Sequence, residues 1–242
     1  MCDATGVAEA MLGLPGFRVL EVVEDPAEVV IEIELIAGVV GCPECGVVAR
    51  AHGRMVVDYR DLAAFGRPVR LRWRKRRFRC EERACAARTW VETSPWFSAR
   101  CLLTERAGRE CCRQVGVNAR PVAQMARELG VCWDTVMEAV REHGQPLVDD
   151  PGRVGEVHAL GVDETSWLAA NRTHHTLYAT GMIDLERRIV IDVVPGNRSG
   201  DLGSWLDDQG PAWCAGIEVV ATDLAESYRA GLAGRLEHAI RV

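Results

Sequence analysis

Arg70-Leu-Arg-Trp-Arg-Lys-Arg-Arg-Phe-Arg-Cys80 is the stretch on which the fold of this chain depends. Three apolar residues (Val69, Leu71 and Trp73) alternate with arginines, which is the period-two pattern of a strand with one buried face. The stretch ends in a cysteine, and another cysteine follows at Cys85. It therefore predicts a β-strand that carries a basic face and runs into a metal-binding loop.

Four of the ten cysteines form two close pairs, in knuckles at 42–45 and 80–85. Two cysteines a few residues apart can share one zinc ion from a single turn. The pattern predicts structural Zn²⁺ held by four thiolates, which leaves no coordination position open for catalysis. The ligands would be Cys42, Cys45, Cys80 and Cys85. The alternative is two chance pairs of buried thiols.

The segment before the first knuckle also has strand character. Residues 17–36 alternate in hydrophobicity, with a turn at Glu24-Asp25-Pro26, and predict two strands. Met55–Tyr59 predicts another strand. Together with the arginine-rich strand, these elements predict a small β-rich zinc-binding domain over residues 1–92.

The charge is distributed unevenly along the chain. Residues 50–100 contain fourteen basic and five acidic residues, although the whole chain has a net charge of −6. Such asymmetry indicates a polyanion-binding segment, and we expect its basic run to contact a phosphate backbone. The predicted contacts are Arg70, Arg72, Arg74, Lys75, Arg76, Arg77 and Arg79. The alternative is a solvated edge strand that is kept charged to prevent aggregation.

From Thr104 the hydrophobic period becomes helical. One helix is expected from Thr104 to about Val115, and a second opens at Asn118-Ala-Arg-Pro121. A third begins near Cys132 and runs to about His143, where Gly144-Gln-Pro146 is expected to stop it.

The second and third helices have the spacing of a helix-turn-helix. Ala126 lies where two helices would pack closely, and Gly130 follows where the turn is needed. We therefore predict a helix-turn-helix DNA-binding domain over 93–148, with Trp133 and Thr135 near the groove. The alternative is an ordinary short helical hairpin.

The last part of the chain predicts the element order β-β-β-α-β-α over residues 152–242. An aspartate follows two of its apolar strands, Asp163 after Leu160-Gly-Val and Asp223 after Val219-Val-Ala-Thr. Adjacent strand ends can bring two carboxylates to one hard cation, as two-metal phosphoryl transfer requires. The pair predicts a magnesium site, although a lone aspartate at a strand end can also be a helix cap. The element order is that of the start of an RNase H-like fold.

These residues resemble insertion-sequence transposases of the ISL-three type, in which a zinc-binding domain, a helix-turn-helix and a DDE catalytic domain follow one another. The matching stretches are Cys42-Pro-Glu-Cys45-Gly, Arg72-Trp-Arg-Lys-Arg-Arg-Phe-Arg-Cys80, residues 121–141, Leu160-Gly-Val-Asp163-Glu and Val219-Val-Ala-Thr-Asp223-Leu-Ala-Glu-Ser-Tyr-Arg. The resemblance implies a multidomain α+β protein whose last domain is a partial RNase H-like α/β domain.

The resemblance also implies a function. The enzyme would bind double-stranded DNA at the terminal inverted repeats of its element, where it could form a homo-oligomer. It would cut and join DNA strands with Mg²⁺ or Mn²⁺. Asp163 and Asp223 match the first two catalytic carboxylates. The family places its catalytic glutamate further downstream, so we expect this chain to be a C-terminally truncated transposase, inactive alone.

Two alternatives stay open at this point. One is a DNA-binding repressor that uses the zinc knuckles and the helix-turn-helix, and a weaker one is a zinc-dependent RNA-binding protein. The chain has no apolar run of about 18 residues and no secretory signal at its N-terminus. We therefore expect a cytoplasmic, nucleoid-associated protein without a membrane partner.

Overall fold

The computed structural model describes residues 4–223 and 226–242. The chain divides into two compact units, Met1–Val148 and Asp149–Val242. The finer division of the first unit into 1–92 and 93–148 stays a prediction. Among the described residues, no helix is long and apolar enough to cross a membrane.

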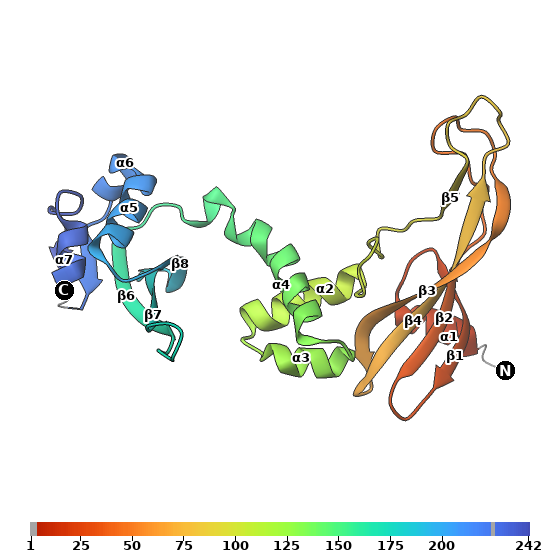
Figure 1. Cartoon of the computed structure of the whole chain (residues 1–242), viewed down its shortest axis with the longest axis horizontal. Helices are drawn as coiled ribbons and strands as arrows, with labels where there is room; N and C mark the ends of the chain where they lie inside the picture. Colours follow the sequence, from red (N-terminus) through yellow and green to blue (C-terminus); the bar gives the residue numbers. More distant parts are fainter. Residues whose placement is uncertain (1–3, 224–225) are drawn as a thin grey trace. The chain divides into compact units, whose positions relative to one another are not determined.

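The first unit contains a twisted sheet in the order β1-β2-β4-β3, with β5 beside β4 (Figure 1). The strands are β1 (Phe17–Glu24), β2 (Val29–Leu35), β3 (Arg50–Ala64), β4 (Arg67–Arg79) and β5 (Thr89–Val91). The predicted strands are confirmed, but β3 is much longer than Met55–Tyr59. The reason is its antiparallel pairing with β4, which runs from Ala64 opposite Arg67 to Arg50 opposite Arg79.

The core of this sheet lies on the face that the alternation predicted. Val69, Leu71 and Trp73 are buried, and the Trp73 ring packs against Phe17 and Phe97 at centroid distances of 5.2 and 4.9 Å. Burying aromatic rings of this size supplies much of the stabilisation of a small sheet. Helix α1 (Ala4–Leu12), which the sequence pattern did not predict, also contributes its Leu12 side chain to this core.

Three helices complete the first unit: α2 (Glu105–Cys112), α3 (Val122–Leu129) and α4 (Trp133–Val148). The Thr104 hydroxyl caps α2 by accepting a hydrogen bond from the Ala107 amide at 3.3 Å. Gly130 ends α3 in the left-handed conformation, with φ of +66°, which an L-residue adopts only with strain. The tight turn lets α3 and α4 share a core with α2 that includes Ala107, Leu129 and Val136.

The predicted ends of two of these helices were wrong. Gly144 and Pro146 do not stop the third helix, because α4 continues to Val148. Pro146 is only two residues from the helix end, so its missing amide removes a bond from the last turn alone. The first helix ends at Cys112 and passes into a π-helical turn, Arg113–Val117.

The segment before α2 attaches the helices to the sheet. The Arg60 amide on β3 donates to the Leu102 carbonyl at 2.7 Å, and the Thr104 amide donates to the Arg60 carbonyl at 2.9 Å. A side chain at Gly130 would also meet Pro68 of β4 at 3.3 Å. The helices of this unit are therefore packed directly on β3 and β4.

The second unit is a sheet in the order β10-β9-β6-β7-β8. Strands β6, β9 and β10 run parallel, whereas β6, β7 and β8 form antiparallel pairs. The strands are β6 (Ala159–Leu168), β7 (Leu177–Asp184), β8 (Ile189–Pro195), β9 (Val219–Thr222) and β10 (Ile240–Arg241). A short 3-10 turn, Pro151–Arg153, precedes them.

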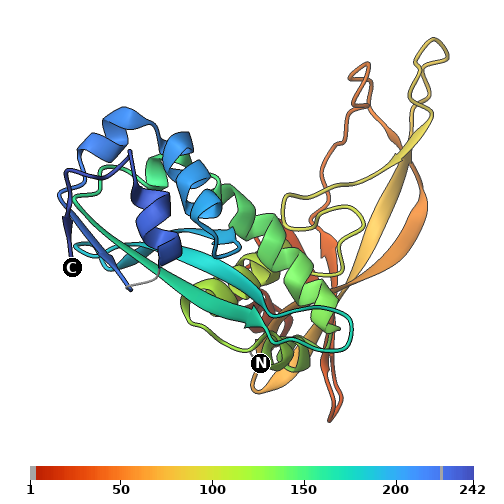
Figure 2. The ribbon, with the colours of Figure 1, turned by 60° about the vertical axis from the view of Figure 1, so that its left-hand side comes forward.

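Helices α5 (Ser199–Gln209), α6 (Pro211–Ala215) and α7 (Glu226–Leu232) lie on one face of this sheet (Figure 2). They bury Leu202, Leu206 and Leu232 against Leu160 and Met182 of the sheet. The predicted order β-β-β-α-β-α is confirmed in outline, while α6 and β10 were not predicted. The last helix of the predicted order is α7, and residues 224 and 225 lie outside the described residues.

One strand boundary bears on function. The sequence predicted that Asp163 ends its strand, but β6 continues to Leu168. Its outer half pairs with β7, where Ser166 lies opposite Tyr178 and Leu168 opposite Leu177. Asp163 is therefore in mid-strand with respect to β7.

Candidate functional site

The four predicted zinc ligands meet in one cluster. Their ligand atoms all lie within 4.8 Å of one another. The Sγ atoms of Cys42 and Cys85 are 3.7 Å apart, and those of Cys45 and Cys80 are 3.6 Å apart. A tetrahedron with Zn–S bonds of 2.3 Å has edges of about 3.8 Å. The cluster therefore has the dimensions of a tetrathiolate zinc site.

The two knuckles form by local turn chemistry. The Gly46 amide donates to the Cys42 carbonyl at 2.9 Å, and Gly46 adopts a φ of +74° that closes the turn around Pro43-Glu44. In the second knuckle the Cys85 amide donates to the Glu82 carbonyl at 3.2 Å. Figure 1 shows both loops at the end of the β3–β4 hairpin that lies away from α2, α3 and α4.

The pKa values of the thiols in the cluster favour a bound cation. Burial raises the pKa of Cys42, but the backbone amides of Cys45 and Glu44 and the thiols of Cys45 and Cys85 outweigh it, and the pKa falls to about 7. Burial and the neighbouring thiols raise the pKa of Cys85 to about 12. One thiolate thus forms readily, while a second is opposed by the first. A divalent zinc ion removes that conflict, because it binds all four sulfurs as thiolates.

The arginines of β4 fall into two groups. The first group projects from the face opposite the core and is ion-paired. Arg70 contacts Glu28 and, at 3.4 Å, Asp58, while Arg72 contacts Asp58 at 3.2 Å. The two further pairs are Arg74 with Glu32 and Arg76 with Glu92. Carboxylates of the turn before β2, of β2, of β3 and of the segment after β5 therefore neutralise four of the seven residues predicted to contact phosphate.

The second group lies at the zinc end of the same hairpin. Arg77 and Arg79 are exposed, and no carboxylate of the described residues forms an ion pair with either. Three other exposed arginines near the knuckles, Arg54, Arg83 and Arg88, likewise have no carboxylate partner within the described ranges. Lys75 belongs to neither group, because its ammonium lies 4.2 Å from the Trp73 ring centroid and burial lowers its pKa.

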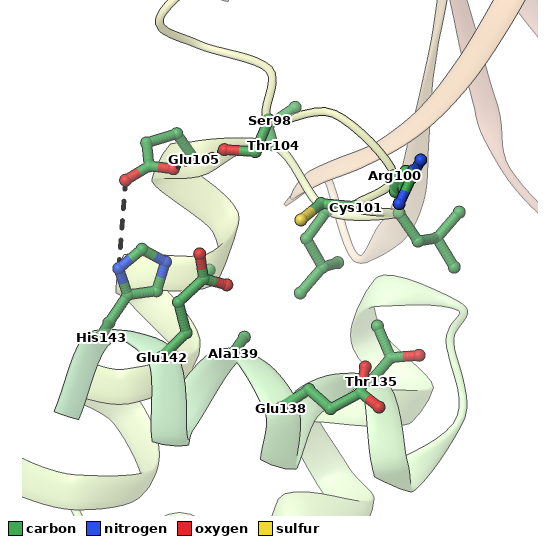
Figure 3. A pocket seen from close by; sticks show the side chains of 13 residues that line it. Ser98, Arg100, Cys101, Thr104, Glu105, Thr135, Glu138, Ala139, Glu142 and His143 are labelled. Atoms are coloured by element: carbon green, nitrogen blue, oxygen red, sulfur yellow. Dashed lines mark hydrogen bonds and ion pairs between the residues drawn. The ribbon is translucent and has the colours of Figure 1, made fainter. Parts of the chain in front are cut away.

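The predicted contacts on α4 lie in different surroundings. Trp133 is 49 % exposed at the start of the helix. Thr135 is half-buried and lines a cavity of about 170 Å³ between α2, α4 and residues 98–104 (Figure 3). Glu105, Glu138 and Glu142 line the same cavity. Their charge disfavours phosphate on this side of α4, so Trp133 is the better placed of the two.

Asp163 and Asp223 are brought together by the register of two parallel strands. The last β6–β9 pair is Val162 opposite Thr222, and each aspartate is the next residue in its chain. Both are exposed. An Asp163 carboxylate oxygen accepts from the Glu164 amide at 2.8 Å, and the Thr222 hydroxyl donates to the Asp223 carbonyl at 2.8 Å. The pair lies where the parallel strands separate, at the carboxyl edge of the sheet.

Two residues that the sequence did not single out lie near this pair. Asn197 donates its side-chain amide to Glu164 at 2.8 Å. Tyr228 of α7 is fully buried, and burial raises its pKa, as do the charges of three carboxylates, Glu164, Asp223 and Asp163. Asn197 follows β8 and reaches the site from 33 residues beyond Glu164, so no local sequence signal marks it. Tyr228 lies shortly after Asp223 in the sequence, but its burial beside the carboxylates is a tertiary feature.

The Tyr228 hydroxyl lacks a well-formed hydrogen bond within the described residues. Thr180 lies close enough to lower the pKa of Tyr228, but its hydroxyl donates to the Gly196 carbonyl at 2.8 Å. Among the described residues, only the four cysteines form a group of three or more close ligands for a metal ion. The carboxylate site therefore consists of the aspartate pair, with Glu164 and Tyr228 beside it.

Comparison with known proteins gives two matched regions. Residues 38–85 match the family described as the zinc-finger of transposase IS204/IS1001/IS1096/IS1165. Residues 160–242 match the DDE transposase family of the ISL-three type. The four cysteines fall in the first region, and Asp163 and Asp223 fall in the second.

A full-length relative matches across both regions. The chain is 27 % identical over 224 residues to the transposase for insertion sequence element IS1001 of Bordetella parapertussis. The match covers 91 % of this chain and 52 % of the relative, so the chain spans about half the length of the curated protein. Because the zinc-finger match, the transposase match and this relative agree in order and position, the chain belongs to the insertion-sequence transposases of the ISL-three type.

Proposed function

We propose that this chain binds duplex DNA through its first unit and supplies two metal-binding carboxylates for DNA strand transfer through its second. The observation that carries the proposal is the placement of Asp163 and Asp223 directly after the last β6–β9 pair. The name of the relative, a transposase for an insertion sequence element, supports DNA ends as the substrate.

The architecture of the second unit supports an RNase H-like domain. Its strands lie in the order β8-β7-β6-β9-β10, with the first three antiparallel and the last two parallel to β6. In such a sheet, carboxylates at the centre are held by two rigid strands rather than by loops. Rigid placement matters because phosphoryl transfer depends on positioning and electrostatic stabilisation.

The first unit supports DNA binding by a helix-turn-helix. Helices α3 and α4 are joined by a left-handed glycine, and Trp133 is exposed at the start of α4. The unpaired arginines at the zinc end provide a second, sequence-independent contact. Zinc would hold the two knuckles together and so fix the positions of these arginines.

In this proposal, Asp163 and Asp223 would hold Mg²⁺ or Mn²⁺ through carboxylate oxygens, and the metal would supply charge stabilisation at the phosphate and activation of the attacking oxygen. Asp163 lies within β6, and Asp223 directly follows β9. The Asp163 carboxylate is oriented further by the Glu164 amide. Asn197 keeps the adjacent Glu164 carboxylate turned toward the end of β8.

Binding of the full chain to Mn²⁺ and to duplex DNA tests both parts separately. Electron paramagnetic resonance should detect Mn²⁺ binding that is lost in Asp163→Asn and in Asp223→Asn. The matched control is Asp134→Asn, an exposed aspartate on α4, which should bind Mn²⁺ like the parent. Equal Mn²⁺ binding by all four proteins would reject the carboxylate site.

DNA binding is measured on duplexes carrying element ends and on unrelated duplexes, over a range of salt concentrations. We expect an affinity that falls with salt for both, and a preference for element ends. Binding to neither duplex at low salt would reject the DNA-binding part, whatever the manganese result.

A further inference from the structure

An exposed aromatic residue lies on the same strand as the first catalytic aspartate. Trp167 is on β6, four residues beyond Asp163, and 76 % of its side chain is exposed. At the rise of a β-strand, four residues span about 13 Å. A side chain on this strand is therefore within reach of a DNA strand that is bound at the aspartate pair.

The backbone sets Trp167 apart from its neighbours. Ser166 pairs with Tyr178 and Leu168 pairs with Leu177, so Trp167 is an extra residue in a β-bulge. A bulge turns one side chain out of the regular alternation and is common beside active sites. Folding does not require this exposure, because a large ring in solvent adds little to stability. Packing therefore does not explain why the Trp167 side chain is turned into solvent.

Trp167 borders an open groove with apolar walls. The groove has a volume of about 600 Å³ and is also lined by Leu177, Tyr178 and Pro195. Leu177 and Tyr178 are 49 % and 37 % exposed. Exposed apolar residues gathered in this way usually mark a binding surface.

The rim of the groove is polar and leads to the carboxylates. Asn197 lines the groove and donates to Glu164, the residue after Asp163. Arg198 also lines it and is exposed, while the neighbouring Asp201 accepts from the Arg198 amide at 2.9 Å. An aromatic wall with an arginine at its edge suits a nucleic-acid strand better than an apolar peptide.

We propose that the Trp167 groove binds an unpaired DNA strand next to the aspartate pair, with a base stacked on the Trp167 ring. Stacking of this kind accepts any base, because every base has a π-face, while Arg198 attracts a phosphate. This inference rests on the proposed function, since strand cutting at element ends is what would place a single strand there.

The test compares the full-length parent with three variants. Trp167→Ala removes the ring, and Trp167→Phe keeps an aromatic face. Val190→Ala is the matched control, because Val190 is a 55 % exposed residue of the same sheet outside the groove. Each protein is titrated with a short oligothymidylate and with a blunt duplex, and 2-aminopurine placed in the single strand reports stacking by its quenching.

We expect Trp167→Ala to weaken binding of the single strand about tenfold, the effect of losing one stacked base, and to abolish quenching. Trp167→Phe should lose less than about threefold, and duplex binding should be unchanged throughout. Unchanged single-strand binding in Trp167→Ala, or an equal loss in Val190→Ala, would overturn the inference while leaving the proposed function intact.

Two other outcomes are distinguishable. If Trp167→Ala converts a dimer of the parent to a monomer in sedimentation without changing DNA binding, the groove holds a second copy and the inference is wrong. If the parent binds neither the single strand nor the duplex, both this inference and the proposed function are wrong.

Discussion

Asp61 of β3 and Arg106 in the first turn of α2 form a two-point ion pair that joins the sheet of the first unit to its helices. Arg106 Nε donates to Asp61 at 2.8 Å, and a second guanidinium nitrogen contacts the other carboxylate oxygen. The Thr104 hydroxyl donates to the same carboxylate at 2.6 Å. The Asp61 side chain is only 2 % exposed. Because the carboxylate is buried, losing any of its three donors would weaken the attachment of the helices to the sheet.

Removing the arginine should therefore be costly. Arg106→Ala leaves the Asp61 carboxylate buried without its counter-ion, and we expect it to lower the free energy of unfolding of the first unit by about 3–5 kcal/mol. Urea denaturation of the full chain measures this. The control is Arg109→Ala, which breaks an exposed pair with Glu105 and should cost less than about 1 kcal/mol. Equal effects of the two variants would contradict the role of burial.

Zinc should be a condition for folding of the knuckles. We expect one zinc ion per chain, and a lower melting temperature of the first unit after treatment with a chelator. Cys80→Ser should abolish the stoichiometric zinc, because it removes one of the four ligands. Cys132→Ser, at an exposed cysteine away from the cluster, should retain it. Metal analysis and a thermal scan measure both effects, and full zinc content in Cys80→Ser would exclude the tetrathiolate site.

The two groups of arginines on β4 should contribute differently to DNA binding. Arg77→Ala with Arg79→Ala should weaken duplex binding and lower the salt slope by about 2, since each lost phosphate contact lowers it by about one unit. Arg72→Ala with Arg74→Ala changes the net charge equally but removes arginines that are already ion-paired. That variant should leave the slope near the parent value. Fluorescence anisotropy at several salt concentrations tests this, and the reverse ranking would place the DNA on the ion-paired face.

Tyr228 should couple alkaline pH to the stability of the second unit. Burial raises its pKa above the ordinary value of 10.0, and the nearby carboxylates raise it further. A raised pKa in the folded state means that the unfolded chain ionises first. The stability that the neutral Tyr228 hydroxyl contributes is therefore fully present below pH 10, and it is lost as the pH rises through the pKa of the folded state. Tyr228→Phe should remove the part of the stability loss at alkaline pH that Tyr228 causes.

At neutral pH the same variant should be neutral or slightly stabilising, because it removes a buried hydroxyl without a well-formed hydrogen bond. Denaturation at pH 7 and above pH 10, compared with the parent, provides the measurement. A large loss of stability at pH 7 would show that the hydroxyl has a partner that supports the fold.

Local patterns in the sequence predicted much of this architecture. The alternation of Val69, Leu71 and Trp73 identified the buried face of β4, because a strand places every second side chain on the same side. The cysteine pairs identified the knuckles for a similar reason, since two ligands within one turn need only local backbone geometry. The order of elements after residue 158 also followed from hydrophobic periodicity.

What local pattern could not decide was the environment of each side chain. The arginines of β4 look equivalent in the sequence, yet Arg72 lies opposite Asp58 of β3 while Arg79 lies opposite Arg50. Pairing register, which is a long-range property, therefore determines which cations are neutralised. The length of β6 is a second example, because its outer half is held by pairing with the distant strand β7.

The sequence by itself thus determined the residue types, the strand and helix periods and the short-range metal ligands. Only the tertiary structure decided that Asp163 and Asp223 are neighbours, that Arg70 to Arg76 are largely ion-paired, and that Asp61 holds α2 against β3. The physical reason is that hydrophobic period and turn chemistry act within a few residues. Charge pairing and parallel register depend on which distant strands become adjacent when the chain folds.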